Sequence, residues 1–422
     1  MYQVERHDAV GANRGRPLAG ARGRISATVW FLGLTSLMTD VSSEMITAIL
    51  PLYLVAHLGL TPLAFGAIDG LQQGLSAVVR WAGGFAGDRL RRHKQVAALG
   101  YALSAAVKPA WIVSGATWPV ISLLVGIDRF GKGIRTAPRD ALISLSTPSS
   151  ALGYAFGVHR ALDATGAMIG PVVAFAILTM HPARFDMVFA FSFAAAMIGL
   201  GILLLFVQNP ATKAREPHAE ADRGPSFSDA FVPLRERWFR TIVIAGSALA
   251  VVTVSDAFIY LTLQRQFQFD VNLLPLMYVV TSFVYLMLAV PFGHLADRHG
   301  RPLMFLAGHV VLLFVYAALL GPVIGGMRFW IAPMLLGAYY AATDGVLPAM
   351  ASARLDARVR GSGLALLGTA TSLSRLLASL IFGWCWMNYG YRQATAAFGT
   401  TLAIVIIAAA YPLARIVRAP SS

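Results

Sequence analysis

The sequence predicts an all-α integral membrane protein with twelve transmembrane helices in two pseudo-symmetric bundles of six. Three observations predict this fold class: an apolar composition, twelve segments long enough to cross a bilayer, and a loop signature that occurs once in each half. Of the 422 residues, 57% are hydrophobic and 13% are charged. This balance is unusual for a water-soluble protein of ordinary composition and places the chain in a membrane.

A membrane-spanning helix needs roughly 20 mostly apolar residues. The chain has room for twelve such segments, separated by short polar stretches. We expect the helices at residues 25–56, 61–86, 95–115, 117–137, 151–179, 185–207, 239–264, 271–295, 302–323, 327–351, 361–387 and 393–415.

The domain organisation follows from the places where the apolar segments stop. Residues 208–238 are polar and contain several prolines, which is typical of a linker. The expected regions are an N-terminal tail at 1–24, an N-terminal bundle at 25–207, the linker at 208–238, a C-terminal bundle at 239–415 and a C-terminal tail at 416–422.

The formal net charge of +14 could indicate a nucleic-acid partner, but the positions of the cations indicate membrane topology instead. If the N-terminus is cytoplasmic, 24 of the 34 Lys and Arg fall in or beside inner segments, Arg135 and Arg139 among them. The outer loops hold four and the helices six. We therefore expect both termini in the cytoplasm, a multi-pass protein of the inner or plasma membrane, and no nucleic-acid partner. The first apolar run is too long for a signal-peptide core and would remain as an anchor.

The repeated signature suggests that one six-helix unit was duplicated. Its two aspartates lie 209 residues apart, about half the chain, and the pairs Pro138 with Pro348 and Asp40 with Asp256 have similar offsets. The two copies read Gly84-Phe-Ala-Gly-Asp88-Arg89-Leu-Arg91-Arg92 and Gly293-His-Leu-Ala-Asp297-Arg298-His-Gly300-Arg301.

Seven acidic and six basic side chains lie inside the predicted spans. Left unpaired, they would cost on the order of 30 to 45 kcal/mol, whereas a folded protein is stable by only about 5 to 15 kcal/mol. Most must therefore pair with each other or face water between the helices. They are Asp40, Glu44, Asp69, Asp128, Asp163, Asp256, Asp344, Arg80, Lys108, Arg129, Lys132, Arg160 and Arg375.

Helical spacing favours two local ion pairs, Asp128 with Lys132 and Arg160 with Asp163. Asp40 and Glu44 stand one turn apart on one helix face. Two such carboxylates repel each other in a poorly solvated site, which favours protonation of one of them, whereas a neighbouring cation such as Lys132 or Arg160 opposes it. The sequence leaves the outcome open.

These features resemble the major facilitator superfamily, in which two six-helix halves enclose a site near the middle of the membrane. The resemblance covers nearly the whole chain, although Arg91 stands where glycine is usual. It implies that the two signature loops act as conformational latches, with Asp88 binding near residues 361–363 and Asp297 near residues 149–150. The alternative is that the loops only set topology and helix ends. The latch residues are Gly84, Asp88, Arg89, Arg92, Gly293, Asp297, Arg298, Gly300 and Arg301.

The resemblance also implies that the third helix is peripheral, so we expect Lys108 to extend its amine to the membrane surface. Gly157, Gly166, Gly170 and Pro171 have the spacing of the superfamily's antiporter signature, although Ala174-Phe175 replaces the usual closing glycines. The motif favours export in exchange for protons, but glycines at these positions are also what close helix packing requires.

Arg129-Phe-Gly-Lys132-Gly133 resembles a second motif, in which Arg129 is tied to proton transfer and Lys132 replaces a glutamine. Residues 39–45 and 131–142 resemble a little-characterised prokaryotic subfamily that has no assigned substrate.

We therefore expect a proton-coupled antiporter that exports a small polar or charged organic solute or drug. Its partners would be the solute, protons and the lipid bilayer, and we expect it to act as a monomer without a cofactor or a metal. The expected proton-coupling residues are Asp40, Glu44, Arg129 and Asp163. The expected substrate contacts are Lys132, Arg160, Asp256, Tyr260 and Asp344.

One alternative is uptake of an anionic metabolite with protons, anchored by Lys132, Arg135 and Arg160. A membrane enzyme should show clustered metal ligands or a paired acid and base, and the sequence shows neither. A sensor would normally bring a sizeable soluble domain, and the tail and linker are short.

Overall fold

The computed structural model describes residues 26–90, 92–113, 117–148, 151–208, 227–321, 328–355 and 359–418. The side chains of 81–90, 227–230, 328 and 416–418 are not described. The described ranges are helical and contain no β-strand, as the predicted fold class requires.

The N-terminal half consists of six spans that follow one another through short connections. Ser26 begins the first helix by accepting a hydrogen bond of 3.3 Å from the Thr28 backbone N–H, as Ser does at helix N-termini. The elements are α1 (Ala27–Pro51) with its continuation η1 (Leu52–His57), α2 (Pro62–Leu90), α3 (His93–Val113), α4 (Trp118–Leu145), α5 (Leu152–Met180) and α6 (Phe185–Phe206).

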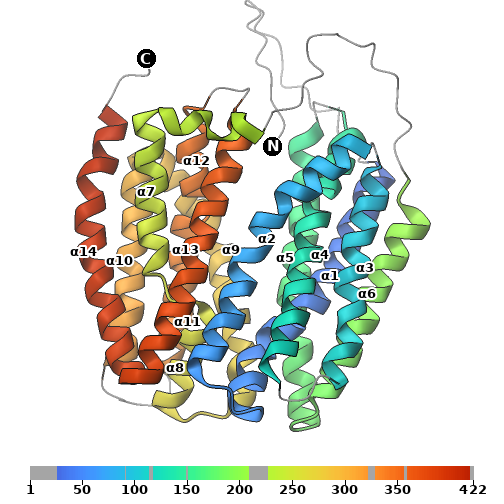
Figure 1. Ribbon diagram of the computed structural model, residues 1–422, viewed down its shortest axis with the longest axis horizontal. Coiled ribbons are helices and arrows are strands. Elements are labelled where there is room, and N and C mark those ends of the chain that lie inside the picture. Colours follow the sequence, from blue (N-terminus) through green and yellow to red (C-terminus); the bar gives the residue numbers. More distant parts are fainter. Residues whose placement is uncertain are drawn as a thin grey trace, which may run out of the picture.

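The C-terminal half stands beside the first (Figure 1). Its elements are η3 (Phe227–Arg235), α7 (Arg237–Val251), α8 (Asp256–Phe267), η4 (Val271–Leu273), α9 (Leu274–His299), α10 (Arg301–Leu320), η5 (Arg328–Trp330), α11 (Ile331–Thr343), α12 (Val346–Ser352), α13 (Arg360–Tyr389) and α14 (Tyr391–Arg418). With α7–α8 and α11–α12 each counted as one interrupted span, the described residues form twelve spans, and the predicted fold is confirmed.

By length and composition, eight of the described helical segments could cross a membrane. The remaining spans are α1, α2, α4 and the interrupted pair α11–α12. Three of these contain ionisable residues predicted for the site: Asp40 in α1, Arg129 in α4 and Asp344 at the end of α11. The spans that do not meet this test of length and composition thus include ones that carry the candidate site.

The fourth span is longer than the sequence predicts. α4 continues to Leu145, so Arg139, which follows the expected end of the span at residue 137, lies within the helix. Arg135 is buried because its guanidinium stacks over the Tyr101 ring, 4.5 Å from the centroid. Close contact with α3 also holds this part of α4: a side chain at Gly131 would come within 2.6 Å of the Gly100 carbonyl oxygen.

Two spans expected to be continuous, 239–264 and 327–351, are interrupted, and the prediction is wrong there. Residues 252–255 leave the helix between α7 and α8, although they include neither Gly nor Pro. Tyr316 of α10 satisfies the freed backbone by donating to the Val252 carbonyl oxygen at 2.9 Å and accepting from the Val254 N–H at 2.8 Å. The second interruption falls at residues 344–345, between α11 and α12.

α1 begins and α14 ends at the same end of the bundle, which we call the terminal end; η1 and η4 lie at the opposite, connector end (Figure 1). At the connector end the halves touch: side chains at Gly66 and Gly383 would come within 2.5 Å of the Ser379 and Pro62 carbonyl oxygens, respectively. Toward the terminal end, side chains at Gly361 and Gly368 of α13 would meet open space. The halves are therefore closed together at the connector end and apart at the terminal end.

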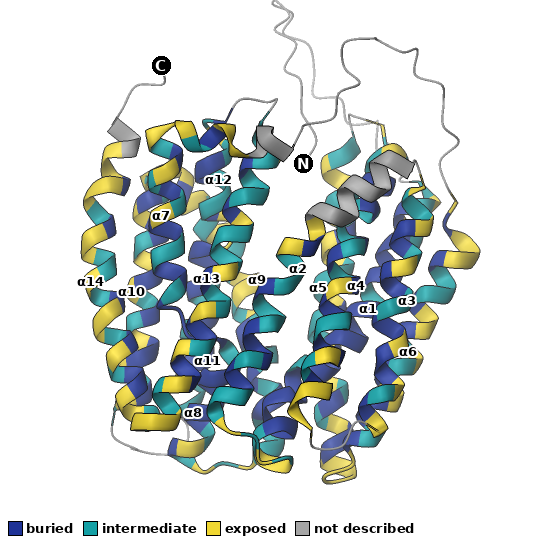
Figure 2. Cartoon of the chain, viewed as in Figure 1, coloured by how far each residue is buried: buried dark blue, intermediate teal, exposed yellow. Residues whose placement is uncertain are grey.

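Buried residues line the inside of each half, while the outward faces are largely exposed (Figure 2). Large apolar side chains such as Leu205, Ile407 and Val290 are more than half exposed. An apolar outer surface of this kind is suited to contact with lipid.

Candidate functional site

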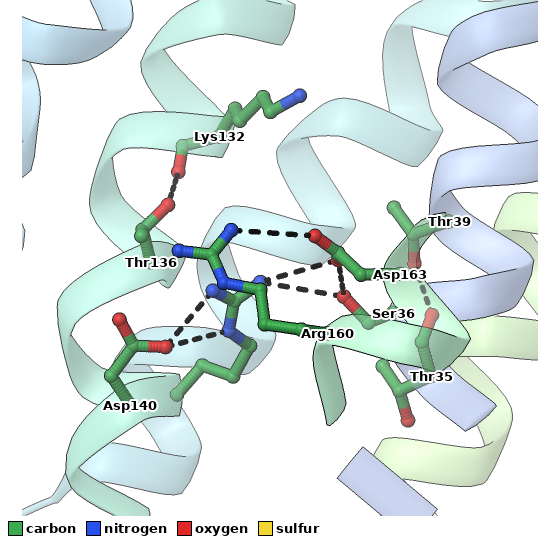
Figure 3. Close-up of polar contacts among 9 residues, drawn as sticks. Thr35, Ser36, Thr39, Lys132, Thr136, Asp140, Arg160 and Asp163 are labelled. Atoms are coloured by element: carbon green, nitrogen blue, oxygen red, sulfur yellow. Dashed lines mark hydrogen bonds and ion pairs between the residues drawn. The ribbon is translucent and has the colours of Figure 1, made fainter. Parts of the chain in front are cut away.

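A polar network joins α1, α4 and α5 in the N-terminal half (Figure 3). The Ser36 hydroxyl donates a hydrogen bond of 2.6 Å to Asp163 Oδ1. Arg139 Nη1 donates to Ser36 Oγ at 3.3 Å and lies 3.9 Å from Asp163 Oδ1. Three helices thus converge on the Asp163 carboxylate, which keeps 22% of its side chain exposed.

The two arginines of this network differ in how freely their charge can act. Arg139 donates to Asp140 Oδ1 from Nε at 3.0 Å and from Nη2 at 2.9 Å, and only 12% of its side chain is exposed. Arg160 Nη1 lies 3.9 Å from Asp163 Oδ2, the local pair predicted from the sequence, but 77% of the Arg160 side chain is exposed. Arg160 is therefore accessible to a ligand, whereas the guanidinium group of Arg139 is occupied by contacts within the protein.

Asp40 lies on α1 one turn beyond Ser36, with 9% of its surface exposed. Its carboxyl group lies close enough to that of Asp163 to interact with it. Two carboxyl groups can share a hydrogen bond only if one of them carries a proton. The neighbour of Asp40 is therefore Asp163 of another helix and not Glu44. Glu44, one turn further along α1, is half-buried and forms no ion pair among the described residues.

Lys132 comes from α4, and no contact joins its ammonium group to Asp163 (Figure 3). Its backbone carbonyl oxygen accepts a hydrogen bond of 2.7 Å from Thr136, while its ammonium group forms no ion pair within the described residues. The expected pair of Asp128 with Lys132 is therefore absent.

Asp128 pairs instead with Lys108 of α3 at 3.1 Å and with Arg129 at 3.4 Å. Lys108 is 2% exposed, so the prediction that it reaches the membrane surface is wrong. The reason is that Asp128 offers a buried lysine a compensating charge, which a lipid-facing position would not. Arg129, predicted for proton transfer, is 9% exposed and takes part in this ion-pair cluster.

In the C-terminal half, the acidic residues lie at the two helix interruptions. Asp256 is the first residue of α8 and accepts a hydrogen bond from the Tyr340 hydroxyl of α11. Asp344 caps the end of α11 and lies 3.5 Å from Arg375 Nη2 of α13. Tyr340 and Arg375 were not among the predicted site residues. The interruption before Asp256 gives no signal in the sequence, because residues 252–255 include neither Gly nor Pro, whereas Gly345 marks the interruption after Asp344.

A cavity of about 130 Å³ adjoins Asp344 and Arg375. It lies inside the C-terminal half, among α7, α10, α11, α12 and α13, and its polar lining includes His309, Thr343, Asp344, Thr371 and Arg375. Asp344 and Arg375 therefore face a space that can hold a small polar group.

Tyr260, predicted as a substrate contact, is fully buried. Its hydroxyl shares a hydrogen bond of 2.7 Å with Thr281 Oγ1, and its ring packs edge-on against Tyr278 at 4.7 Å between centroids. In this conformation Tyr260 packs the C-terminal half and does not face a ligand.

The second signature loop has well-defined contacts. Arg301 pairs with Asp297 at 2.9 Å and donates to the Ala349 carbonyl oxygen at 2.8 Å, which fastens the loop to α12. Gly300 ends α9 with a φ of +104°, a conformation that L side chains rarely adopt. In this conformation, therefore, Asp297 has its partner in its own half, while the predicted partner region at 149–150 lies outside the described residues.

The remaining described residues of the two signatures lie at the surface or beside open space. Arg298 and Arg92 are exposed, and Gly293 has open space at its Cα. The side chains of Gly84, Asp88 and Arg89 lie outside the described residues.

The glycines of the α5 motif divide into two kinds. A side chain at Gly166 would clash with the backbone of Leu37, and one at Gly170 would come within 2.6 Å of the Val41 carbonyl oxygen. A side chain at Gly157 would meet open space, so packing does not account for that glycine in this conformation. Pro171, also within α5, is buried.

Among the described residues, no group of three or more His, Cys, Asp or Glu side chains is placed to hold a metal ion. Cys385 is a free thiol in α13, half-buried.

Comparisons with known proteins agree with this architecture. The chain is 29% identical over 394 residues to the uncharacterized MFS-type transporter MJ1317 of Methanocaldococcus jannaschii, covering 90% of this chain and 93% of that protein. It is 33% identical over 152 residues to the uncharacterized protein Rv2265 of Mycobacterium tuberculosis, covering 36% and 37% of the two chains.

Solved structures show the same fold at low sequence identity. The nucleoside transporter NupG superposes with a TM-score of 0.74 at 13% identity, covering 92% of this chain and 99% of that one. A bacterial homologue of the human lysosomal transporter Spinster, in an inward-facing and unoccupied conformation, gives 0.70 at 14% identity, covering 95% and 100%.

The sequence pattern of the Major Facilitator Superfamily matches residues 32–277 and 241–421, which together cover both halves. The chain is therefore a member of the Major Facilitator Superfamily and a transporter of the membrane-spanning kind.

Proposed function

We propose that this protein is a proton-coupled antiporter that exports a small polar or charged organic solute by alternating access. We place it in the inner or plasma membrane as a monomer, with both termini in the cytoplasm. On that topology the terminal end is cytoplasmic, so the conformation with separated halves there is inward-facing.

The observation that carries the proposal is the contact between the Asp40 and Asp163 carboxyl groups beneath Ser36 and Arg139. The pair needs one proton to form its hydrogen bond. When that proton leaves, two carboxylates face each other and attract a cation. A cationic group of the substrate and a proton therefore compete for the same site, and such competition is what exchange requires.

The charges suggest a zwitterionic solute. The N-terminal half offers Lys132, without an ion pair among the described residues, and Arg160, largely exposed. The C-terminal half offers Asp256 and Asp344 with Arg375 as the neighbouring cation. A solute that carries an anionic group and an ammonium group satisfies both signs, which a singly charged solute does not.

Uptake of an anion with protons is the second candidate, and the exposure of Arg160 favours it. Protonation of Asp163 would free Arg160, so an anion and a proton would bind together and not in competition. The predicted anchor Arg135 is not part of this candidate, because its side chain is buried against the Tyr101 ring.

Flux in inverted vesicles separates the two candidates. A thermal-shift screen of amino acids, dipeptides and nucleosides first supplies a ligand, because binding raises apparent stability. With an imposed proton gradient, accumulation of that ligand as protons leave the vesicles indicates export. Proton-linked loss of the ligand from the vesicles would overturn the proposal in favour of uptake.

A further inference from the structure

Asp69 is a buried carboxyl group at the contact between the two halves. It lies on α2, is 3% exposed, and its Oδ2 accepts a hydrogen bond of 2.6 Å from Ser379 of α13. Ser255, just before α8, lies close enough to the Asp69 carboxyl group to interact with it. One side chain of the N-terminal half thus lies beside two separate elements of the C-terminal half.

The surrounding contact is tight and lies at the connector end. Side chains at Gly66 and Gly70 of α2 would approach the Ser379 and Leu376 carbonyl oxygens to 2.5 Å and 3.0 Å. One residue before Gly66, the Phe65 ring of α2 packs edge-on against Phe258 of α8 at 4.9 Å between centroids. Water therefore has little access to Asp69 while the halves stay in contact.

The ionisable neighbours do not balance a negative charge there. α8 contributes Asp256, a like charge, and α9 contributes Tyr278. Both lie close enough to Asp69 to interact with it electrostatically. On α13, Arg375 stands one turn from Ser379 but pairs with Asp344. Within the described residues, the Ser379 hydroxyl donates a hydrogen bond to Asp69, and no Lys or Arg forms an ion pair with it.

The other elements packed against α2 add no cation at this level. α1 contributes Glu44, another acid, and is joined to α2 through Gln72, which donates to Thr47 at 3.1 Å. α4 runs alongside α2 with Gly126 near Leu75 and Gly133 near Val79. Asp69 therefore lies beside the uncharged first turns of α4, and Asp128 and Lys132 are further along.

An ionised carboxylate without a counter-charge is costly in such a dry site, whereas a neutral carboxylic acid is not. Alternating access requires the halves to part at the connector end. Parting would hydrate Asp69 and remove the cost of its charge. Closure and protonation of Asp69 are therefore linked.

We propose that Asp69 is a protonation-dependent gate residue: a bound proton lets α2 close against α13, and loss of the proton, with repulsion from Asp256, favours their separation. The inference rests on the proposed alternating-access function. It is independent of Asp40 and Asp163, which would couple transport to protons at the other site.

The test measures the gate itself and needs no substrate. Spin labels at Thr61→Cys and Asn388→Cys, at the connector ends of α2 and α13, are introduced with Cys385→Ala and reconstituted in liposomes. Pulsed electron paramagnetic resonance then reports the distance between them over a pH series. We expect a short-distance population that grows as the pH falls, and in Asp69→Asn a short distance at every pH.

Asp186→Asn is the matched control, because Asp186 is an exposed acid of the N-terminal half that pairs with Arg184. It should keep the response of the parent protein. Ser379→Ala keeps the carboxyl group but removes its hydrogen-bond donor, so the short-distance population should shrink at each pH while the pH response persists.

A pH response in Asp69→Asn equal to that of the parent, or a parent without one, would overturn the gate. If Asp69→Asn does not fold, an unchanged population in Ser379→Ala overturns it instead. Normal gating with uncoupled flux in Asp40→Asn would leave the gate intact, so the two proposals fail separately.

Discussion

Lys108 of α3 and Asp128 of α4 form a buried ion pair of 3.1 Å, and 3% and 9% of their side chains are exposed. The pair joins two helices at the level where Arg129 also approaches Asp128, at 3.4 Å. Buried charges of this kind are stable only together, because either one alone would be left without compensation.

Replacement of Lys108 by Met should therefore destabilise the protein. Loss of one partner of a buried pair costs about 3–5 kcal/mol in soluble proteins, and Arg129 should reduce the loss here toward the lower end. Thermal unfolding in detergent should show a clear fall in Tm, partly recovered by adding Asp128→Asn. Arg265→Met, at an exposed position, is the control. A Tm equal to that of the control would mean that the pair contributes nothing.

The α5 glycines provide a matched comparison within one helix. Gly166→Ala places a methyl group against the backbone of Leu37, which cannot yield as a side chain could, and overpacking of this kind costs about 1–3 kcal/mol. Gly157→Ala meets open space and should be neutral or stabilise by up to about 1 kcal/mol. Thermal unfolding of the two variants checks the order. Equal losses would show that α1 and α5 are not in the contact described.

Tyr316 should stabilise the interruption between α7 and α8. Tyr316→Phe leaves the Val252 carbonyl and the Val254 N–H without their partner, and each unsatisfied buried group costs about 1–3 kcal/mol. Hydrogen exchange of residues 252–255 should accelerate and Tm should fall. Tyr411→Phe, an exposed tyrosine of α14, should change neither. Unchanged exchange in Tyr316→Phe would mean that the interruption does not depend on this hydroxyl.

The repeated halves and most of the helix positions could be predicted because they depend on composition and on the length of apolar segments. Buried charges also pair as expected in the clusters around Asp128 and Asp163. The partners of individual charged residues could not be predicted, because they lie on other helices. Asp128 pairs with Lys108, twenty residues earlier, and Asp69 bonds to Ser379, 310 residues later.

The interruption between α7 and α8 could not be predicted for a different reason. Residues 252–255 read Val-Thr-Val-Ser and continue an apolar run, with no helix-breaking residue. What stops the helix is tertiary: Tyr316 from α10 takes over the backbone groups. Asp256 was predicted for the site from its position in the repeat, but its hydrogen bond with Tyr340 depends on this interruption.

The most direct test of the shared proton between Asp40 and Asp163 is infrared spectroscopy of the protein in liposomes. The carbonyl stretch of protonated carboxylic acids is followed through a pH titration. We expect one titrating band to be lost in both Asp40→Asn and Asp163→Asn and retained in Asp186→Asn. Retention of the complete titration in both variants would contradict the account, because the two carboxyl groups would then not hold the proton that couples transport.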